Sequence, residues 1–397
     1  MMSEIQITDE KGYNKMKKYD KLPYRLEFIK KILFDNRLTP LLDIDLNETA
    51  TFSDIRNVLQ KKTYDFNYIM NTINAKLVYI KSGSTGHTFK GFTVNGKGEI
   101  EDSFAVKVVA YPKKERYGNL NDIKRPENAE LFMLKLLSYF VVNNQTPHII
   151  LPIATFNTSI KPFLVLKDTI IKHKRYDEFV EKFNNGEYYD NVSVLISEWA
   201  NSGDLLDYFR KNIKSLKLVH YKVIFFQVLS VLAVIQNKYP EFRHNDMKAN
   251  NLLVHKIECH RNNKYKYKIN GQKYIIPNVG IQVKLWDFDF ACIPPVVRNT
   301  KVEAKWTDKI NIKPVQNKYY DIHYFFNTLT KKGFISDFFS YTEIPQDVKD
   351  FFRRVVPEKY STGKEVTDRG RLLVDDEYLS PDGILKSDPF FAVFRTE

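Results

Sequence analysis

The chain has 397 residues, a formal net charge of +13 and a hydrophobic content of 43%. Such a chain can bury sizeable cores, which excludes an extended disordered protein and favours one large or two ordinary globular domains. Its two cysteines, Cys259 and Cys292, are too few for a disulfide framework. We therefore predict an intracellular, cytoplasmic protein.

The charge pattern and the apolar runs limit the kinds of partner. Lysines are spread along most segments, so we treat them as a solvated surface and predict no specific nucleic acid. The N-terminus is polar and lacks the apolar region of a signal peptide. The longest apolar run, residues 223–235, is shorter than the roughly 20 residues that cross a bilayer, so we predict no transmembrane segment. No pattern specifies an oligomeric state.

Residues 1–75 are predicted to form a helical N-terminal extension. Apolar residues recur there at spacings of three and four, over residues 25–34 and 52–73. A cap on the rest of the fold and a docking module for a partner both fit such an extension.

Residues 76–200 read as a small β-rich lobe with one inserted helix. Segments rich in Val, Phe and Tyr alternate with small-residue turns, which is typical of strands. The expected strands cover residues 75–94, 102–111, 148–156 and 192–200, and the expected helix covers residues 125–140.

Residues 201–397 read as a larger, mostly helical lobe. A long apolar helix is expected over residues 220–239, and a polar, lysine-rich insertion follows at 256–273. We therefore predict an α+β fold with two lobes, preceded by the helical extension.

A small-residue turn at 81–88, "KSGSTGHT", is a candidate phosphate site. Gly83 and Gly86 occupy the second and third glycine positions of a Gly-x-Gly-x-x-Gly turn, and Lys81 occupies the first. Glycines there let backbone N–H groups approach a phosphate closely, so Gly83, Ser84 and Gly86 are predicted to bind nucleotide.

Lys107 lies in the apolar strand "FAVKVV", where its ammonium group is suited to hold the α- and β-phosphates of a nucleotide. Such a lysine needs a carboxylate partner. Glu130 belongs to a predicted helix with Leu134 and Leu137 on its apolar side, and we favour it as the partner. Glu127, one turn earlier, is the alternative.

Two further stretches carry the chemistry of phosphoryl transfer. In "HNDMKANN" (244–251), Asp246 is suited to accept a hydroxyl proton, Lys248 to neutralise the moving phosphoryl group, and Asn251 to bind a metal. In "KLWDFDF", a strand delivers Asp287, a hard oxygen ligand suited to Mg²⁺. Asn251 and Asp287 together are the predicted metal site, with Mn²⁺ as an alternative ion.

Taken in order, these residues resemble the protein-kinase fold, and the resemblance covers about residues 76–394. "SEWANSGDLLDYF" (197–209) looks like the family's hinge, which implies adenine contacts from the backbone of Glu198 and Ala200 and a ribose contact from Asp204. "YYDIHYFFNTL" is similar to the long helix whose acid, here Asp321, supports the catalytic loop. The resemblance implies ATP as substrate and Lys248 implies Ser or Thr acceptors.

A narrower likeness is to the serine/threonine kinases that poxviruses and related large DNA viruses package in virions. "LWDFDF", the tyrosine pair before Asp321 and the lack of Ala-Pro-Glu between 290 and 320 carry it. It implies an ATP-dependent serine/threonine protein kinase with protein substrates, found in host cytoplasm and virion.

Two departures concern the catalytic motifs. Asn245 replaces an arginine that in many kinases binds a phosphate on the following segment, so we expect activity that is independent of phosphorylation between 290 and 320. Asp289 replaces a glycine, and it either stabilises the loop, which we favour, or assists the metal.

Two other functions remain as alternatives. A choline- or aminoglycoside-type small-molecule phosphotransferase would also carry His-x-Asp and Asp-Phe-Asp, although Lys248 and the 319–329 helix favour a protein kinase. A pseudokinase scaffold would be expected to lose Lys107, Asp246, Asn251 or Asp287, which are all present.

Overall fold

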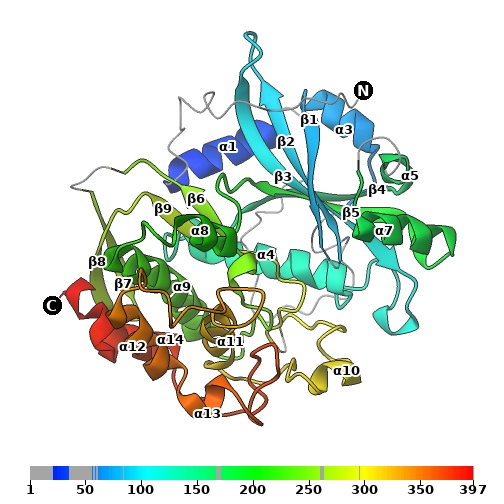
Figure 1. The fold of residues 1–397 in the computed structure, drawn as a ribbon. Helices are drawn as coiled ribbons and strands as arrows, with labels where there is room; N and C mark the ends of the chain where they lie inside the picture. The colour runs from blue at the N-terminus through cyan, green and yellow to red at the C-terminus, as the bar shows by residue number, and fades with distance from the viewer. Residues whose placement is uncertain are drawn as a thin grey trace. The chain divides into compact units, whose positions relative to one another are not determined.

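The computed structural model describes residues 21–34, 56, 59, 61–83, 85–166, 171–259, 263–294 and 296–396. The chain divides into two compact units. The first comprises Met1–Leu136 and Leu151–Trp199, and the second comprises Leu137–Ile150 and Ala200–Glu397. The first is built on a β-sheet and the second is mainly helical (Figure 1), so the predicted mixture of α and β structure is confirmed.

The first unit is organised around a five-stranded sheet in the order β1-β2-β3-β5-β4, and every neighbouring pair is antiparallel. Strand β3 is buried on both faces over residues 104–111, as expected for its run of Phe, Val, Ala and Tyr. Lys107 lies in the middle of this buried run. The strands are β1 (Lys76–Ser82), β2 (His87–Val94), β3 (Ile100–Pro112), β4 (Pro152–Ser159) and β5 (Tyr188–Glu198).

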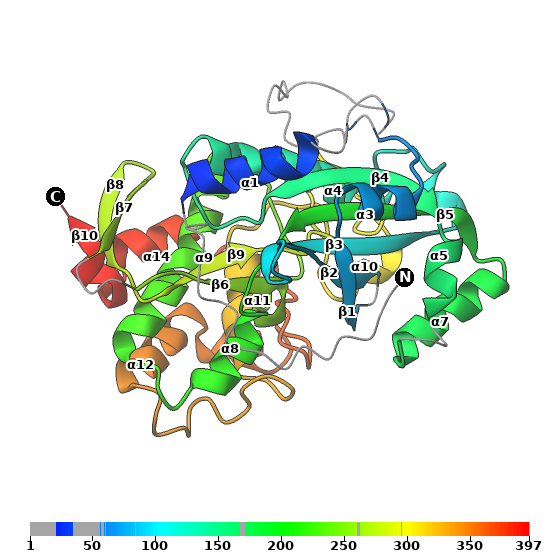
Figure 2. The same cartoon turned by 90° about the horizontal axis from the view of Figure 1, so that it is seen from above.

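Helices cover this sheet. The expected helix at 25–34 is α1, which packs against β4 (Figure 2). Of the expected helix at 52–73, the structure has α3 near its end, and residues 52–55, 57, 58 and 60 lie outside the described residues. Helix α7, which packs against β5, was not predicted. The elements are α1 (Leu22–Phe34), α3 (Phe66–Thr72), η2 (Glu115–Tyr117), α4 (Pro126–Val142), α5 (Lys161–Leu164) and α7 (Lys174–Asn184).

The segment just before α3 extends the sheet at β4. The amide of Asn157 donates to the Lys62 carbonyl at 2.8 Å, and Asn157 accepts from the Tyr64 amide at 2.9 Å. Lys61 enters the core there, 4% exposed, and its Nζ donates to Tyr111 Oη at 2.6 Å and Ser193 Oγ at 2.7 Å. Burial lowers the pKa of Lys61 to about 7.

This buried lysine predicts a pH dependence of stability. The unfolded chain binds a proton on Lys61 up to its ordinary pKa of 10.5, whereas the folded chain releases that proton near pH 7, so stability rises with pH across this window. Relative to Lys61→Met, the free energy of unfolding of the wild type should rise by about 3 kcal/mol from pH 7 to pH 10 in urea titrations. Lys62→Met, at an exposed neighbour, should follow the wild-type curve. Parallel curves for wild type and Lys61→Met would contradict the prediction.

The second unit has an aromatic core around helix α9 (Leu218–Lys238). The ring of Phe225 lies 5.2 Å from that of Phe326 in α11 (Tyr320–Leu329) and 5.5 Å from that of Phe352 in α12 (Gln346–Val355). Gln227 binds strand β9 through both ends of its amide, donating to Ile281 O and accepting from Val283 N. Strand β9 (Ile281–Leu285) ends two positions before Asp287. This packing therefore fixes the start of the Asp-Phe-Asp stretch.

Helix α9 contains the apolar run that the sequence analysis considered too short to cross a membrane. The complete helix has 21 residues and, by length and composition, is long and apolar enough to do so. Within the described residues it is the single helix of this kind, and 78% of its apolar window is buried inside the protein. That burial is typical of a core helix.

Two small sheets complete the second unit. Strands β6 and β9 form one antiparallel pair, and β10-β8-β7 form the other. The lysine-rich insertion is therefore an ordered hairpin over part of its length. Strand β6 follows the "HNDMKANN" stretch, and β9 precedes the "DFD" stretch. The elements are α8 (Leu205–Asn212), η3 (Ala249–Asn251), β6 (Leu252–Lys256), β7 (Lys264–Ile269), β8 (Gln272–Pro277), β9 (Ile281–Leu285), α10 (Lys305–Asp308), α11 (Tyr320–Leu329), α12 (Gln346–Val355), α13 (Glu358–Ser361), α14 (Pro381–Ser387), η4 (Pro389–Phe394) and β10 (Arg395–Thr396).

Candidate active site

The glycine turn joins β1 to β2 in the first unit. The Gly83 amide donates to the Gly86 carbonyl at 2.8 Å, which closes the turn. A Cβ atom at Gly86 would lie 2.8 Å from both the Val108 carbonyl oxygen and Val109 Cγ2, so position 86 requires glycine. The predicted phosphate ligand Ser84 lies outside the described residues.

Lys107 and Glu130 form a buried ion pair in the first unit. The Lys107 Nζ to Glu130 Oε1 distance is 2.6 Å, and the side chains are 8% and 6% exposed. Glu127, the alternative partner, instead accepts from Arg125 Nε at 3.1 Å. The pair joins the middle of β3 to α4 and gives the lysine one fixed position, as a phosphate ligand requires.

Two of the predicted hinge residues, Glu198 and Asp204, have side chains that bind other parts of their own unit. Glu198, the last residue of β5, binds Arg25 of α1 through two hydrogen bonds of 2.7 Å, and its Oε2 also accepts from the Leu151 amide at 2.8 Å. In the second unit, Asp204 caps α8 by accepting from the Asp207 amide at 3.0 Å, and Ala200 is buried. The Glu198 side chain is thus engaged in ion pairing, and its amide donates to the Leu151 carbonyl at 3.0 Å.

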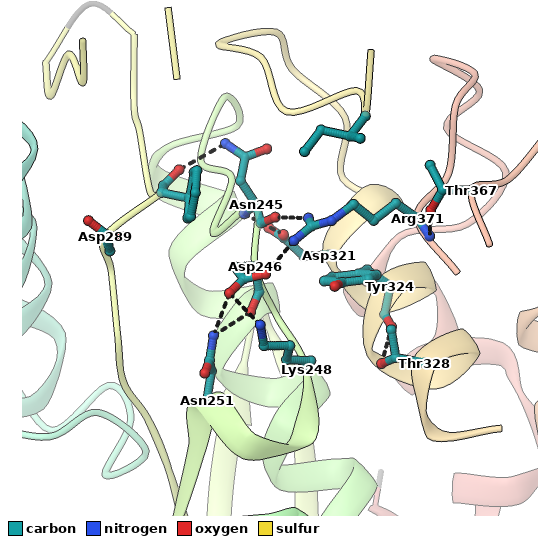
Figure 3. Close-up of polar contacts among 12 residues, drawn as sticks. Asn245, Asp246, Lys248, Asn251, Asp289, Asp321, Tyr324, Thr328, Thr367 and Arg371 are labelled. Atoms are coloured by element: carbon teal, nitrogen blue, oxygen red, sulfur yellow. Dashed lines mark hydrogen bonds and ion pairs between the residues drawn. The ribbon is translucent and has the colours of Figure 1, made fainter. Parts of the chain in front are cut away.

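In the second unit, Asp246, Lys248 and Asn251 converge on one carboxylate (Figure 3). Asp246 Oδ2 accepts from Lys248 Nζ at 2.8 Å and from Asn251 Nδ2 at 2.9 Å. The loop that carries them is supported by Asp321 of α11, which accepts from the backbone amides of His244 at 2.7 Å and Asn245 at 2.9 Å. The sequence analysis had given Asp321 this supporting position.

Asp321 supports the loop from a fully buried position. Burial raises the pKa of its carboxyl, while the charges of His244 and Arg243 and the two amide hydrogen bonds oppose that shift. Charge-assisted bonds from two consecutive amides fix the backbone just before Asp246.

The donor set of the predicted metal site fits a hard cation. Both groups bound to Asn251 Nδ2 are acceptors, the carbonyl and carboxylate of Asp246, so Asn251 Oδ1 is directed away from them and is available as a ligand. Asp287 follows β9 with a φ of +63°, a left-handed conformation that is uncommon for aspartate. The described residues hold no group of three His, Cys, Asp or Glu side chains for a metal. An amide and a carboxylate oxygen, completed by phosphate oxygens, suit Mg²⁺.

Comparison with known proteins shows the family of the chain. The poxvirus serine/threonine protein kinase family matches residues 99–376, which include Lys107, Glu130, Asp246, Asn251 and Asp287. The chain belongs to this family. The family match and the names of the similar proteins confirm the prediction of a serine/threonine kinase of the kind found in poxviruses and related large DNA viruses.

Relatives of this family occur in two groups of viruses. A protein of Acanthamoeba polyphaga mimivirus named as a serine/threonine-protein kinase is 46% identical over 380 residues, covering 94% of this chain and 80% of the relative. A second mimivirus protein, named only as uncharacterized, is 26% identical over 345 residues, covering 84% of this chain and 38% of its own length. Serine/threonine-protein kinase 2 of Monkeypox virus is 29% identical over 200 residues, which cover 49% of this chain and 40% of the relative.

Asn245 has a structural role that the sequence analysis missed. Its φ is +62°, in the left-handed region that asparagine adopts more readily than most residues. Its Nδ2 donates to the Phe290 carbonyl at 3.0 Å, so the residue ties the catalytic loop to the segment after the Asp-Phe-Asp triplet. Asparagine at this position of a poxvirus-family kinase therefore shapes the loop, in addition to removing a phosphate-binding arginine.

Asp289 is held by the segment that follows it. Lys301 Nζ forms an ion pair with Asp289 Oδ2, and Asn299 Nδ2 donates to the Asp289 carbonyl at 3.0 Å. Both side chains of the ion pair are largely buried. These contacts favour the loop-stabilising role over a role in binding metal.

Each unit has one arginine that binds a predicted site residue and that was not itself predicted. Arg25 contacts Glu198 from 173 positions away, and Arg371 contacts Asp246 from 125 positions away. Neither stands in a motif or at a fixed spacing from its partner, so a single sequence carries no signal for either contact.

Proposed function

We propose that the chain is a serine/threonine protein kinase that transfers the γ-phosphoryl group of ATP to a protein hydroxyl in the presence of Mg²⁺. The observation that carries the proposal is the Asp246 carboxylate, held by Lys248 and Asn251 on a loop that Asp321 supports. Membership of the poxvirus kinase family supports it independently.

In this proposal Asp246 accepts the proton of the attacking hydroxyl, and Lys248 neutralises charge on the phosphoryl group as it moves. Asn251 Oδ1 and the Asp287 carboxylate would hold Mg²⁺, which neutralises phosphate charge when bound. Lys248 lies 2.8 Å from Asp246, so the proton acceptor and the cation lie side by side. Both are fixed before substrate arrives, which lowers the entropic cost of reaching the transition state.

The first unit supplies the nucleotide-binding residues in the same proposal. Backbone amides of the glycine turn approach the phosphates, and Lys107 holds the α- and β-phosphates. The backbone of Glu198 and Ala200 binds adenine, and Asp204 contacts the ribose. We propose residues 76–200 and 201–397 as the two lobes of the kinase, with 1–75 as a helical extension.

A radiolabelled-ATP assay tests the function. Wild type and Asp246→Ala are incubated with casein, a basic protein or choline, with Mg²⁺ or EDTA. We expect label on serine and threonine of a protein acceptor, lost in EDTA and in Asp246→Ala. Label on choline alone would replace the proposal with a small-molecule kinase, and no label on any acceptor would favour a scaffold.

A further inference from the structure

The guanidinium group of Arg371 lies against the candidate catalytic carboxylate (Figure 3). Arg371 Nη2 donates to Asp246 Oδ1, and Nη1 donates to the Asn245 carbonyl and, at 3.3 Å, to Tyr320 Oη. The arginine is 8% exposed. It therefore holds both the side chain of Asp246 and the backbone of the residue before it.

The loop around Arg371 is built to hold that cation in place. Thr367 and Arg371 bind each other twice, through Thr367 N to Arg371 O at 2.8 Å and Arg371 N to Thr367 Oγ1 at 3.0 Å. Between them Gly370 has a φ of +82°, and its carbonyl accepts from Asn327 of α11 at 3.1 Å. The guanidinium carbon lies 4.0 Å from the centre of the Tyr324 ring, also in α11. Stacking on an aromatic face and a short closed turn restrict the side chain to one position.

These contacts occupy most of the acceptor capacity of Asp246. A carboxylate has about four lone-pair sites. Lys248 and Asn251 fill two on Oδ2, and Arg371 fills one on Oδ1. The site left to accept the proton of a substrate hydroxyl is therefore on Oδ1, beside Arg371.

The segment that would normally supply a regulatory phosphate offers no suitable acceptor. Between residues 290 and 318 the sequence has two side-chain hydroxyls, Thr300 and Thr307. Thr307 is fully buried and donates to the Val302 carbonyl at 2.9 Å, and the Thr300 hydroxyl is also buried. At position 245 there is no arginine to receive such a phosphate. The cation that orders the catalytic loop comes from Arg371 instead.

We propose that Arg371 is a positioning residue for Asp246, which keeps the catalytic loop in its active arrangement without phosphorylation of the 290–318 segment. The inference rests on the proposed function, because it assigns Asp246 as the proton acceptor. Arg371 acts through Asp246 and the Asn245 carbonyl. Its guanidinium is permanently charged, so the positive charge beside Asp246 does not depend on another enzyme.

Steady-state kinetics with purified full-length variants test this role. Arg371→Ala should lower kcat by about 100-fold, the cost of a misplaced catalytic group, with KM for ATP nearly unchanged. Arg371→Lys should show a smaller loss, because one ammonium cannot bind the carboxylate and the carbonyl in the same fork geometry. Arg369→Ala, at an exposed arginine of the same loop, should match the wild type. Wild type treated with phosphatase should keep its turnover.

Two readouts separate positioning from a general structural effect. Millimolar guanidinium chloride should partly restore kcat of Arg371→Ala and should not increase that of Arg369→Ala. Hydrogen exchange should accelerate at the His244 and Asn245 amides of Arg371→Ala, while the amides of α11 remain protected. An Arg371→Ala enzyme with wild-type kcat and exchange would overturn the inference, and so would a loss of kcat that neither guanidinium nor Arg371→Lys improves.

The exchange measurement keeps the two proposals distinguishable. If the wild type phosphorylates no acceptor, the proposed function fails, and the amides of the catalytic loop still report whether Arg371 orders it. If the wild type is active and Arg371→Ala is equally active, the function stands and the role of Arg371 fails.

Discussion

Asp246→Asn should lower kcat by about 10³-fold, because it removes the group that accepts the hydroxyl proton while preserving the size of the side chain. Asparagine still occupies the position between Lys248, Asn251 and Arg371, so binding of ATP with Mg²⁺ should change little. Rates of phosphate transfer and isothermal titration with a non-hydrolysable ATP analogue measure the two quantities.

Asp308→Asn is the matched control, since Asp308 is an exposed aspartate of α10 in the same unit. It removes one carboxylate without touching the catalytic loop and should keep wild-type kcat. Equal rates for Asp246→Asn and the wild type would show that Asp246 is not the proton acceptor.

Lys107→Met should affect stability and activity together. Removing the lysine breaks the buried ion pair with Glu130, whose side chain is 6% exposed, and breaking such a pair typically costs about 3–5 kcal/mol of stability. Loss of a fixed cation at the phosphates should lower kcat/KM by about 10²- to 10³-fold. Urea denaturation and the protein-kinase assay provide the two measurements.

The double variant Lys107→Met/Glu130→Leu separates these effects. Two apolar side chains remove the buried charge entirely, and such replacements are often neutral or stabilising. Stability should therefore return to about the wild-type value, while activity remains as low as in Lys107→Met. Recovery of activity in the double variant would mean that Lys107 acts only by neutralising Glu130.

The candidate catalytic residues could be recognised in the sequence because the chemistry proposed for them requires fixed local spacing. Asp246, Lys248 and Asn251 lie within six consecutive positions, and the structure brings their polar groups within 2.9 Å. Glu130 was favoured over Glu127 on helical spacing alone, and the ion pair follows that preference. The family to which these motifs pointed is confirmed by the match over residues 99–376.

The parts that sequence reasoning missed depend on tertiary contacts. The hairpin β7-β8 has exposed lysines on one face and was read as a solvated insertion, although Tyr267 on its other face stacks on His148. Helix α7 is amphipathic but short, and its burial depends on β5. Asn245 was interpreted only as the replacement of an arginine, because the left-handed backbone conformation that it adopts is not visible in a sequence.

The ion pair between Arg25 and Glu198 has a practical consequence for the smallest active fragment. The family match begins at residue 99 and the kinase-like motifs at residue 81, so either would suggest removing both α1 and α3, which precede β1. A fragment cut there would expose the surface of β4 that α1 covers and leave Glu198 without its arginine. Recombinant versions intended for inhibitor screening should therefore begin ahead of Leu22.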